Sequence, residues 1–193
     1  HRYIRRQRQM CIRDSEKIGV FYGSTTCYTE IAAEKICGEI NSLMNSKTTS
    51  LYNVSSTSVS KMNDYKYLIL GIPTWDFGEL QEDWENQWEE LSELNLESKY
   101  VAVFGLGDQV GYPEWFQDAM GYLWQKIKNQ GASMAGCWPN KNFSFTQSKA
   151  LNYEKSEFVG LPLDDENQFD QTDNLIKVWT KKVLVEFGIS DIE

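Results

Sequence analysis

Residues 17–30 have the sequence Lys-Ile-Gly-Val-Phe-Tyr-Gly-Ser-Thr-Thr-Cys-Tyr-Thr-Glu, and this stretch is the strongest indication of the fold. Its apolar first half, residues 18–21, predicts a buried strand, and its second half is rich in hydroxyl groups. A helical pattern of apolar residues follows at about 29–44, so the hydroxyl-rich turn leads from a strand into a helix. The first N–H groups of a helix lack intrahelical acceptors and can bind a phosphate. A Ser/Thr-rich helix cap without a ligand is the simpler alternative.

This turn does not match the common nucleotide-binding loops. It has neither the Walker spacing of an ATP-binding loop nor the G-x-G-x-x-G of a dinucleotide-binding fold. No lysine lies between Gly23 and Glu30, so neutral groups alone would have to hold the phosphate. Such a site favours a compact phosphate monoester over a triphosphate, which needs its charge neutralised.

Two further apolar runs end in loops that contain a large aromatic residue. One leads into Pro-Thr-Trp-Asp-Phe-Gly-Glu at 73–79, which contains Trp75. The other leads into Gly-Leu-Gly-Asp-Gln-Val-Gly-Tyr at 105–112, which ends at Tyr112. In an open parallel sheet, ligands bind beyond the carboxyl ends of the strands. The three loops together predict a site for a flat ring between the two aromatic side chains, with a phosphate tail at the hydroxyl-rich turn.

The chain resembles the long-chain flavodoxins over about residues 17–188. Four segments carry the resemblance: G-S-T-T-C-Y-T-E at 23–30, G-I-P-T-W-D-F-G-E-L-Q-E-D-W at 71–84, F-G-L-G-D-Q-V-G-Y at 104–112 and F-V-G-L-P-L-D-D-E-N-Q at 158–168. The resemblance implies a flavodoxin-like, doubly wound α/β fold with a five-stranded parallel sheet. The strand order 2-1-3-4-5 is the known order of that family. It also implies an insertion that interrupts the last strand, and FMN as a non-covalently bound cofactor.

The resemblance also implies which residues contact FMN. It places the phosphate at Ser24, Thr25, Thr26, Cys27, Tyr28 and Thr29, and the ring between Trp75 and Tyr112. The other expected contacts are Pro73, Thr74, Asp76, Phe77, Gly78, Gly105, Leu106, Gly107, Asp108, Trp115, Gln117 and Glu166. One position departs from the family: flavodoxins usually carry glycine where Cys27 stands, so this loop must turn without one. No catalytic side chain and no metal site is expected.

The implied function is that of a low-potential one-electron carrier, in which FMN carries the electron and the protein supplies no reacting group. The fully reduced ring is an anion at neutral pH, so nearby acids would lower its reduction potential. These acids are Glu79, Asp83, Glu85 and Asp108. The family places a movable peptide at 76–77, where neither residue is glycine. The acidic run 79–93 has a simpler interpretation as a solvated helix face.

The partners that the resemblance implies are redox proteins: an NADP-linked flavoprotein reductase, or photosystem I if the source is a phototroph. Phe77 and Val110 would form an apolar rim at the flavin edge, and the acids around it would steer basic partners.

The alternative function is a flavodoxin-fold NAD(P)H-dependent quinone or azo reductase, whose nicotinamide would need the ring face that Tyr112 covers. A response-regulator receiver of the same topology is excluded, because Tyr-Gly-Ser at 22–24 replaces the acidic pocket that it needs.

The composition predicts a single acidic domain at residues 16–193. Residues 1–15 hold five arginines and one aspartate without an apolar pattern, and we interpret them as a disordered, non-native extension. Without their charge of +4, the net charge changes from −9 to −13. Such a charge opposes binding to nucleic acid or to an anionic membrane. No apolar run reaches the ~18 to 20 residues of a membrane span.

The cysteine pattern predicts the compartment. None of the four cysteines forms a C-x-x-C pair or a plausible disulfide framework. We therefore expect a reduced protein of the cytoplasm, or of the stroma in a plastid-bearing source. We also expect a monomer.

The rest of the chain alternates strands with amphipathic helices. We expect strands at 48–54, 67–72 and 100–104, and helices at 80–91, 114–129 and 172–187. The polar connection at 55–63 has room for one helical turn. The last strand is divided into 133–138 and 158–163 by an insertion at 139–157, whose role the sequence does not reveal.

Overall fold

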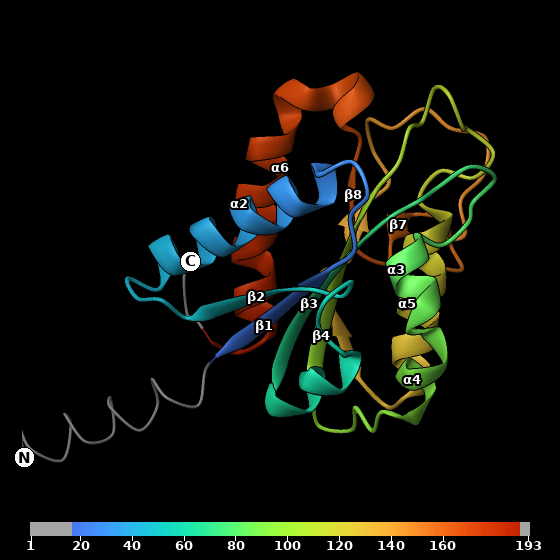
Figure 1. Ribbon diagram of the computed structural model, residues 1–193. Helices are drawn as coiled ribbons and strands as arrows, with labels where there is room; N and C mark the ends of the chain where they lie inside the picture. The colour runs from blue at the N-terminus through green and yellow to red at the C-terminus, as the bar shows by residue number, and fades with distance from the viewer. Residues whose placement is uncertain (1–16, 190–193) are drawn as a thin grey trace, which may run out of the picture.

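A parallel sheet forms the centre of the molecule, and the computed structural model describes residues 17–189 (Figure 1). Its strands are β1 (Ile18–Tyr22), β2 (Thr49–Asn53), β3 (Tyr67–Pro73), β4 (Tyr100–Leu106), β5 (Ser133–Ala135) and β8 (Leu161–Leu163). The helices are α2 (Tyr28–Leu43), α3 (Glu82–Asn86), α4 (Trp88–Glu93), α5 (Asp118–Asn129) and α6 (Asp165–Glu186), with a 3-10 helix η1 (Val59–Asp64). The strand order is β2-β1-β3-β4-β5, which confirms the predicted fold class.

The fifth strand of the sheet is divided into two pieces that both pair with β4. β5 pairs in parallel with residues 100–102, and β8 pairs in parallel with residues 104–106. The insertion between them contributes an antiparallel pair, β6 (Trp138–Pro139) and β7 (Glu157–Phe158). The prediction of an interrupted last strand is therefore confirmed. Because β1, β3 and β4 run parallel, their carboxyl ends meet at one edge of the sheet.

Helices cover both faces of the sheet. α2 and α6 lie on one face, and α3, α4 and α5 lie on the other (Figure 1). The core under α2 and α6 contains the buried side chains of Ile36 and Trp179, and the core on the other face contains those of Trp84 and Met120. The sheet is thus buried on both faces, which explains why its strands read as continuous apolar runs.

The helix predicted at 80–91 is two short helices, α3 and α4, so the prediction of one continuous helix is wrong. The break lies at Gln87, whose backbone angles (φ −104°, ψ 7°) leave the helical region. The side-chain amide of Gln87 forms hydrogen bonds with the backbone of the 54–59 connection and so ties the break to that segment. The apolar stripe is kept across the break, with Trp84 and Leu91 buried.

Two other helices begin at residues that differ from the predicted ones. α5 begins at Asp118 rather than at 114, because Gln117 has a left-handed backbone (φ 65°) that cannot continue a right-handed helix. α6 begins at Asp165 rather than at 172, and the side chain of Asp164 caps its first turn. Both helices therefore place polar residues close to the sheet edge at which β3 and β4 end.

No helix between residues 17 and 189 is both long and apolar enough to cross a membrane. In the same part of the chain, no three His, Cys, Asp or Glu side chains are grouped so as to hold a metal ion. Cys27, Cys37 and Cys137 are free thiols. The interpretation of residues 1–15 as a non-native extension concerns residues outside the described range.

Candidate functional site

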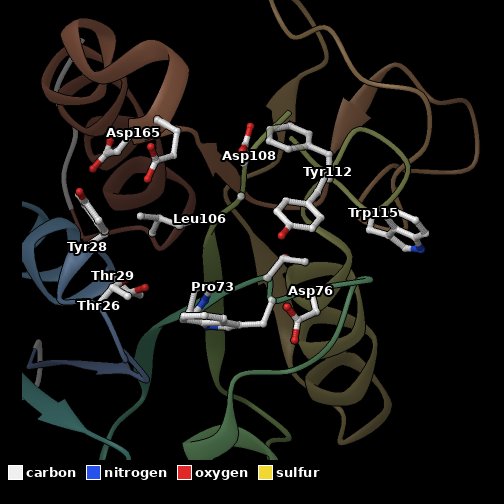
Figure 2. Close-up of a pocket in the computed structure, with 15 residues that line it drawn as sticks. Thr26, Tyr28, Thr29, Pro73, Asp76, Leu106, Asp108, Tyr112, Trp115 and Asp165 are labelled. Atoms are coloured by element: carbon white, nitrogen blue, oxygen red, sulfur yellow. The ribbon is translucent and has the colours of Figure 1, made fainter. Parts of the chain in front are cut away.

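A pocket of about 260 Å³ lies where β1, β3 and β4 end (Figure 2). Its walls come from the loops that follow these three strands and from the start of α6. The lining residues are Thr26, Tyr28, Thr29, Pro73, Thr74, Trp75, Asp76, Leu106, Gly107, Asp108, Tyr112, Trp115, Phe116, Asp165 and Glu166. The three loops singled out in the sequence therefore meet at one pocket.

The loop between β1 and α2 presents polar groups that lack partners. Ser24 Oγ is buried and has no hydrogen-bond partner among the described residues. Thr26 and Thr29 line the pocket at the start of α2, where N–H groups have no intrahelical acceptor. None of the described lining residues is a lysine or an arginine. This donor set fits a phosphate held by neutral groups, because a buried hydroxyl without a partner is unfavourable unless a ligand supplies one.

Cys27 explains how this loop turns without the glycine that is usual in the family. Its backbone is left-handed (φ 68°, ψ −10°), a conformation that glycine adopts at the least cost. The residue immediately precedes α2 and its side chain is exposed. A side chain in this conformation costs roughly 1–2 kcal/mol. The loop therefore makes the turn, with backbone strain at one residue.

The loop after β3 is a tight turn that begins at Trp75. The N–H groups of Gly78 and Glu79 both donate to the carbonyl of Trp75, at 3.0 and 2.7 Å. The N–H of Trp75 donates in return to the carbonyl of Glu79, at 3.1 Å. Asp76 has a positive φ of 40°, and Gly78 follows at φ 87°. The peptide at 76–77 thus lies at the tip of the turn, and its movement stays a prediction.

The loop after β4 carries Tyr112 and is organised by a carboxylate. Asp108 Oδ1 accepts hydrogen bonds from the N–H groups of Val110 (2.9 Å) and Gly111 (2.7 Å). Asn167 Nδ2 also donates to it, at 2.8 Å. Burial by itself would raise the pKa of Asp108, but these hydrogen bonds outweigh it and hold the pKa below its ordinary value. Tyr112 is 44% exposed, and its ring points into the pocket (Figure 2).

Comparison with known proteins identifies the family. The flavodoxin family model matches residues 20–179 of the chain. The chain belongs to the flavodoxin family. Flavodoxin 2 of Escherichia coli (strain K12) is 48% identical over 171 residues, which cover 89% of this chain and 96% of that protein. The flavodoxin of Nostoc sp. (strain PCC 7120 / SAG 25.82 / UTEX 2576) is 46% identical over 175 residues, which cover 91% and 99%.

A solved structure gives the same result for the fold. The Fusobacterium nucleatum flavodoxin, bound to flavin mononucleotide, superposes with a TM-score of 0.82 at 26% identity and covers 88% of this chain and 98% of its own. Flavodoxins are electron-transfer proteins that use FMN, and they are not enzymes. Family membership therefore confirms the expected class of function, and the quinone or azo reductase alternative is not favoured.

Some residues predicted to contact FMN lie beside the pocket of this flavodoxin rather than on its wall. These are Ser24, Thr25, Cys27, Phe77, Gly78, Gly105 and Gln117. Gln117 is fully buried, and its Nε2 donates to the carbonyl of Leu163, at 2.9 Å. Gly105 packs against the same side chain, because a Cβ there would overlap Gln117 Oε1. Gly105 and Gln117 thus support the site from behind, and a direct contact of either with FMN stays a prediction.

Two lining residues, Phe116 and Asp165, were not predicted. The Phe116 ring packs against Phe143 and Phe145 of the insertion, with centroids 5.8 and 5.1 Å apart. Its position depends on an insertion that the sequence pattern does not place. Asp165 precedes the predicted contact Glu166 in the first turn of α6. A prediction that started this helix at the D-D-E-N segment would have included Asp165 with Glu166.

The two residues predicted to form an apolar rim are exposed beside the pocket, and their place at the flavin edge stays a prediction. Phe77 and Val110 are each 67% exposed, and they lie in the loops that carry Trp75 and Tyr112. The Phe77 ring rests edge-on against Trp115, with centroids 5.1 Å apart and an interplanar angle of 72°. An exposed phenylalanine supported in this way offers a fixed apolar contact next to the pocket.

Proposed function

We propose that this pocket binds FMN with the phosphate at residues 24–29 and the ring between Trp75 and Tyr112. One observation carries the proposal: Trp75 and Tyr112 line one pocket together with Thr26 and Thr29, and the unpartnered hydroxyl of Ser24 lies in the same loop as these threonines. Neutral donors suit a phosphate monoester, and an aromatic pair suits a planar ring. The solved Fusobacterium nucleatum flavodoxin, which is bound to FMN, supports this assignment.

Bound FMN supplies the one-electron chemistry, and the residues of this chain set how readily the ring accepts charge. The acids that line the pocket are Asp76, Asp108, Asp165 and Glu166. Each of them repels a negative charge added to the ring, so together they lower the reduction potential. Because the pKa of Asp108 lies below its ordinary value, this carboxylate stays charged at neutral pH. None of the described lining residues is basic, so nothing on the wall offsets the repulsion.

The partners we propose are basic redox proteins: an NADP-linked flavoprotein reductase, or photosystem I if the source is a phototroph. The rim formed by Phe77 and Val110 would contact the partner over the flavin edge. The exposed acids next to this rim, Glu79, Glu82 and Glu85, would steer a basic surface toward it. We further propose a monomer of the cytoplasm, or of the stroma in a plastid-bearing source. Residues 16–193 would form its one domain, and residues 1–15 would be a non-native extension.

A visible absorption spectrum of the purified protein tests the cofactor. Flavin bands are expected, and apoprotein from which they have been removed should recover the same spectrum when FMN is added. Absence of these bands before and after the addition of FMN would overturn the proposal.

Addition of NADPH alone then distinguishes a carrier from a reductase. The flavin should stay oxidised until a flavoprotein reductase is added, whereas rapid bleaching of its absorption without one would favour an enzyme.

A further inference from the structure

Asp164 is a buried carboxylate that lies behind the loop carrying Tyr112. It is 1% exposed, and none of the ion pairs found within residues 17–189 includes it. Donor N–H groups satisfy its oxygens instead. Oδ2 accepts from the backbone N–H (3.1 Å) and the side-chain Nε2 (2.7 Å) of Gln109, and Oδ1 accepts from the N–H of Asn167 (3.1 Å). A buried carboxylate depends on such bonds, because losing them leaves a desolvated charge.

Gln109 extends this contact to the insertion. Its side chain is 4% exposed, and its Oε1 accepts a hydrogen bond from the N–H of Ser144, at 2.6 Å. The two ends of the amide therefore serve different partners: Nε2 bonds to the start of α6, and Oε1 bonds to the insertion at 139–157. One buried side chain thus joins three segments that are far apart in the sequence.

A second link holds the other end of the same loop. The carbonyl of Pro113 accepts hydrogen bonds from the N–H groups of Thr146 (2.7 Å) and Gln147 (3.0 Å), which also belong to the insertion. Tyr112 is therefore flanked by two anchors, one at Gln109 and one at Pro113. A displacement of the loop at Gln109 would break its bonds to Asp164, so these bonds favour the observed conformation.

We propose that Asp164 and Gln109 are a positioning pair that holds the Tyr112 loop, defined as residues 107–113, as a fixed wall of the flavin site. Neither residue lines the pocket, so the pair acts through Tyr112. Ser144 extends the pair, and the loop is thereby bonded to the insertion as well as to the start of α6. The proposal rests on the assignment of Tyr112 to one face of the ring under the proposed function.

Two substitutions break the pair with little change in shape. Asp164→Asn places an NH₂ group against N–H donors in either orientation of the amide, because both carboxylate oxygens accept hydrogen bonds. Gln109→Glu keeps an acceptor for Ser144 but sets a carboxylate against Asp164. Asp170→Asn, at an exposed position of the same helix, is the matched control for the loss of charge.

Hydrogen exchange of the apoprotein and titration with FMN measure the two consequences separately. In both pair variants, amides 110–112 should exchange at least about tenfold faster than in the wild type, since the loop opens more often. FMN should bind at least about tenfold more weakly and fluoresce more brightly, because its ring is stacked for less of the time. Asp170→Asn should match the wild type in all three measurements. Unchanged exchange at Leu123 of α5 would show that the fold is intact.

The outcomes distinguish this proposal from the function on which it rests. Unchanged exchange and unchanged affinity in Gln109→Glu would overturn the positioning pair, even if Asp164→Asn does not fold. Faster exchange with unchanged FMN affinity and quenching would overturn the link between the loop and the ring, and with it the place given to Tyr112. Failure of the wild-type protein to bind FMN would overturn the proposed function itself, and the exchange rates would still report on the pair.

Discussion

The two loops that border opposite parts of the pocket are built on different principles. The carboxylate of Asp108 in the Tyr112 loop, and that of Asp164, which holds this loop from the start of α6, are satisfied by N–H donors of the protein. In the loop at 24–29, Ser24 Oγ is buried without a partner among the described residues, and Cys27 is held in a left-handed conformation. One loop is complete without a ligand, and the other leaves donors free for one.

This difference indicates how the site divides its tasks. A wall whose polar groups already have hydrogen-bond partners is preorganised. A ring that stacks on it therefore loses little binding free energy to the ordering of the loop. A loop with unpaired hydroxyl groups instead gains most of its hydrogen bonds from the ligand. We therefore expect the affinity for FMN to depend most strongly on the phosphate and less on each ring contact.

The largest expected effect comes from removing the phosphate. Riboflavin, which lacks it, should bind at least about a hundredfold more weakly than FMN, because two lost hydrogen bonds to a charged group amount to about 3 kcal/mol. Calorimetric titration of the apoprotein with each compound measures the difference, and lumiflavin serves as a control that also lacks the ribityl chain. Near-equal affinities for FMN and riboflavin would remove the role given to residues 24–29 and erase the contrast between the two loops.

The next largest effect is expected on the ring side. Trp75→Ala should weaken FMN binding at least about tenfold and brighten its fluorescence, since stacking contributes roughly 0.5–1.5 kcal/mol beyond the area that it buries. Trp88→Ala is the matched control, because Trp88 lies outside the pocket and packs near Lys126. Affinity and quenching that stay at wild-type values in Trp75→Ala would count decisively against the aromatic sandwich.

The features of this site that the sequence predicts are those encoded within one segment. Apolar runs followed by loop motifs were sufficient to predict β1, β3 and β4 and to place Trp75 and Tyr112 at one pocket. The break between α3 and α4 was missed because Gln87 bonds to residues 54–59, which periodicity does not relate to it. The start of α6 was missed because its cap and first turn interrupt the apolar pattern.

Contacts between distant segments were the least predictable part of the site. The segments D-D-E-N and G-D-Q are parts of recognisable motifs. Their spacing in the sequence does not predict that Asp164 contacts Gln109 or that Gln109 contacts Ser144. Such pairs form only after the sheet and the insertion have folded, because each partner comes from a different loop. For the same reason Phe116 was not predicted as a lining residue, whereas the neighbouring Trp115 was.

Charge should affect the ring side of the molecule more than the phosphate side. Electron transfer from a basic reductase should slow at least about tenfold between low ionic strength and ~0.5 M salt, because screening shortens the reach of the acids. Glu79→Lys with Asp83→Lys should remove much of this dependence in stopped-flow measurements. Glu93→Lys with Glu97→Lys, both exposed near the far end of α4, is the matched control and should keep most of it. An electron-transfer rate that does not vary with salt would contradict steering by the acids and would favour the simpler interpretation of run 79–93 as a solvated helix face.

A several-fold effect is expected on the reactivity of Cys27. Its thiol is exposed within the loop that we assign to the phosphate, so FMN should slow its modification by a thiol reagent by roughly fivefold or more through steric cover. Labelling would be measured with and without FMN after Cys11, Cys37 and Cys137 are replaced by Ser. Equal rates in the two states would mean that the ligand does not cover this residue and would place the phosphate elsewhere.

The smallest expected effect concerns the strain at Cys27. Cys27→Gly should relieve the cost of the left-handed backbone, roughly 1–2 kcal/mol. Glycine also loses more conformational freedom on folding, which costs roughly 0.5–1 kcal/mol. The net gain in the free energy of unfolding should therefore be between about 0 and 1.5 kcal/mol, measured by urea denaturation of the apoprotein. Cys27→Ala removes the thiol but keeps the Cβ atom, so its stability should stay close to that of the wild type. If glycine destabilises the protein while alanine does not, the turn at Cys27 is not strained. The phosphate loop would then not differ in backbone strain from the Tyr112 loop, whose polar groups have hydrogen-bond partners.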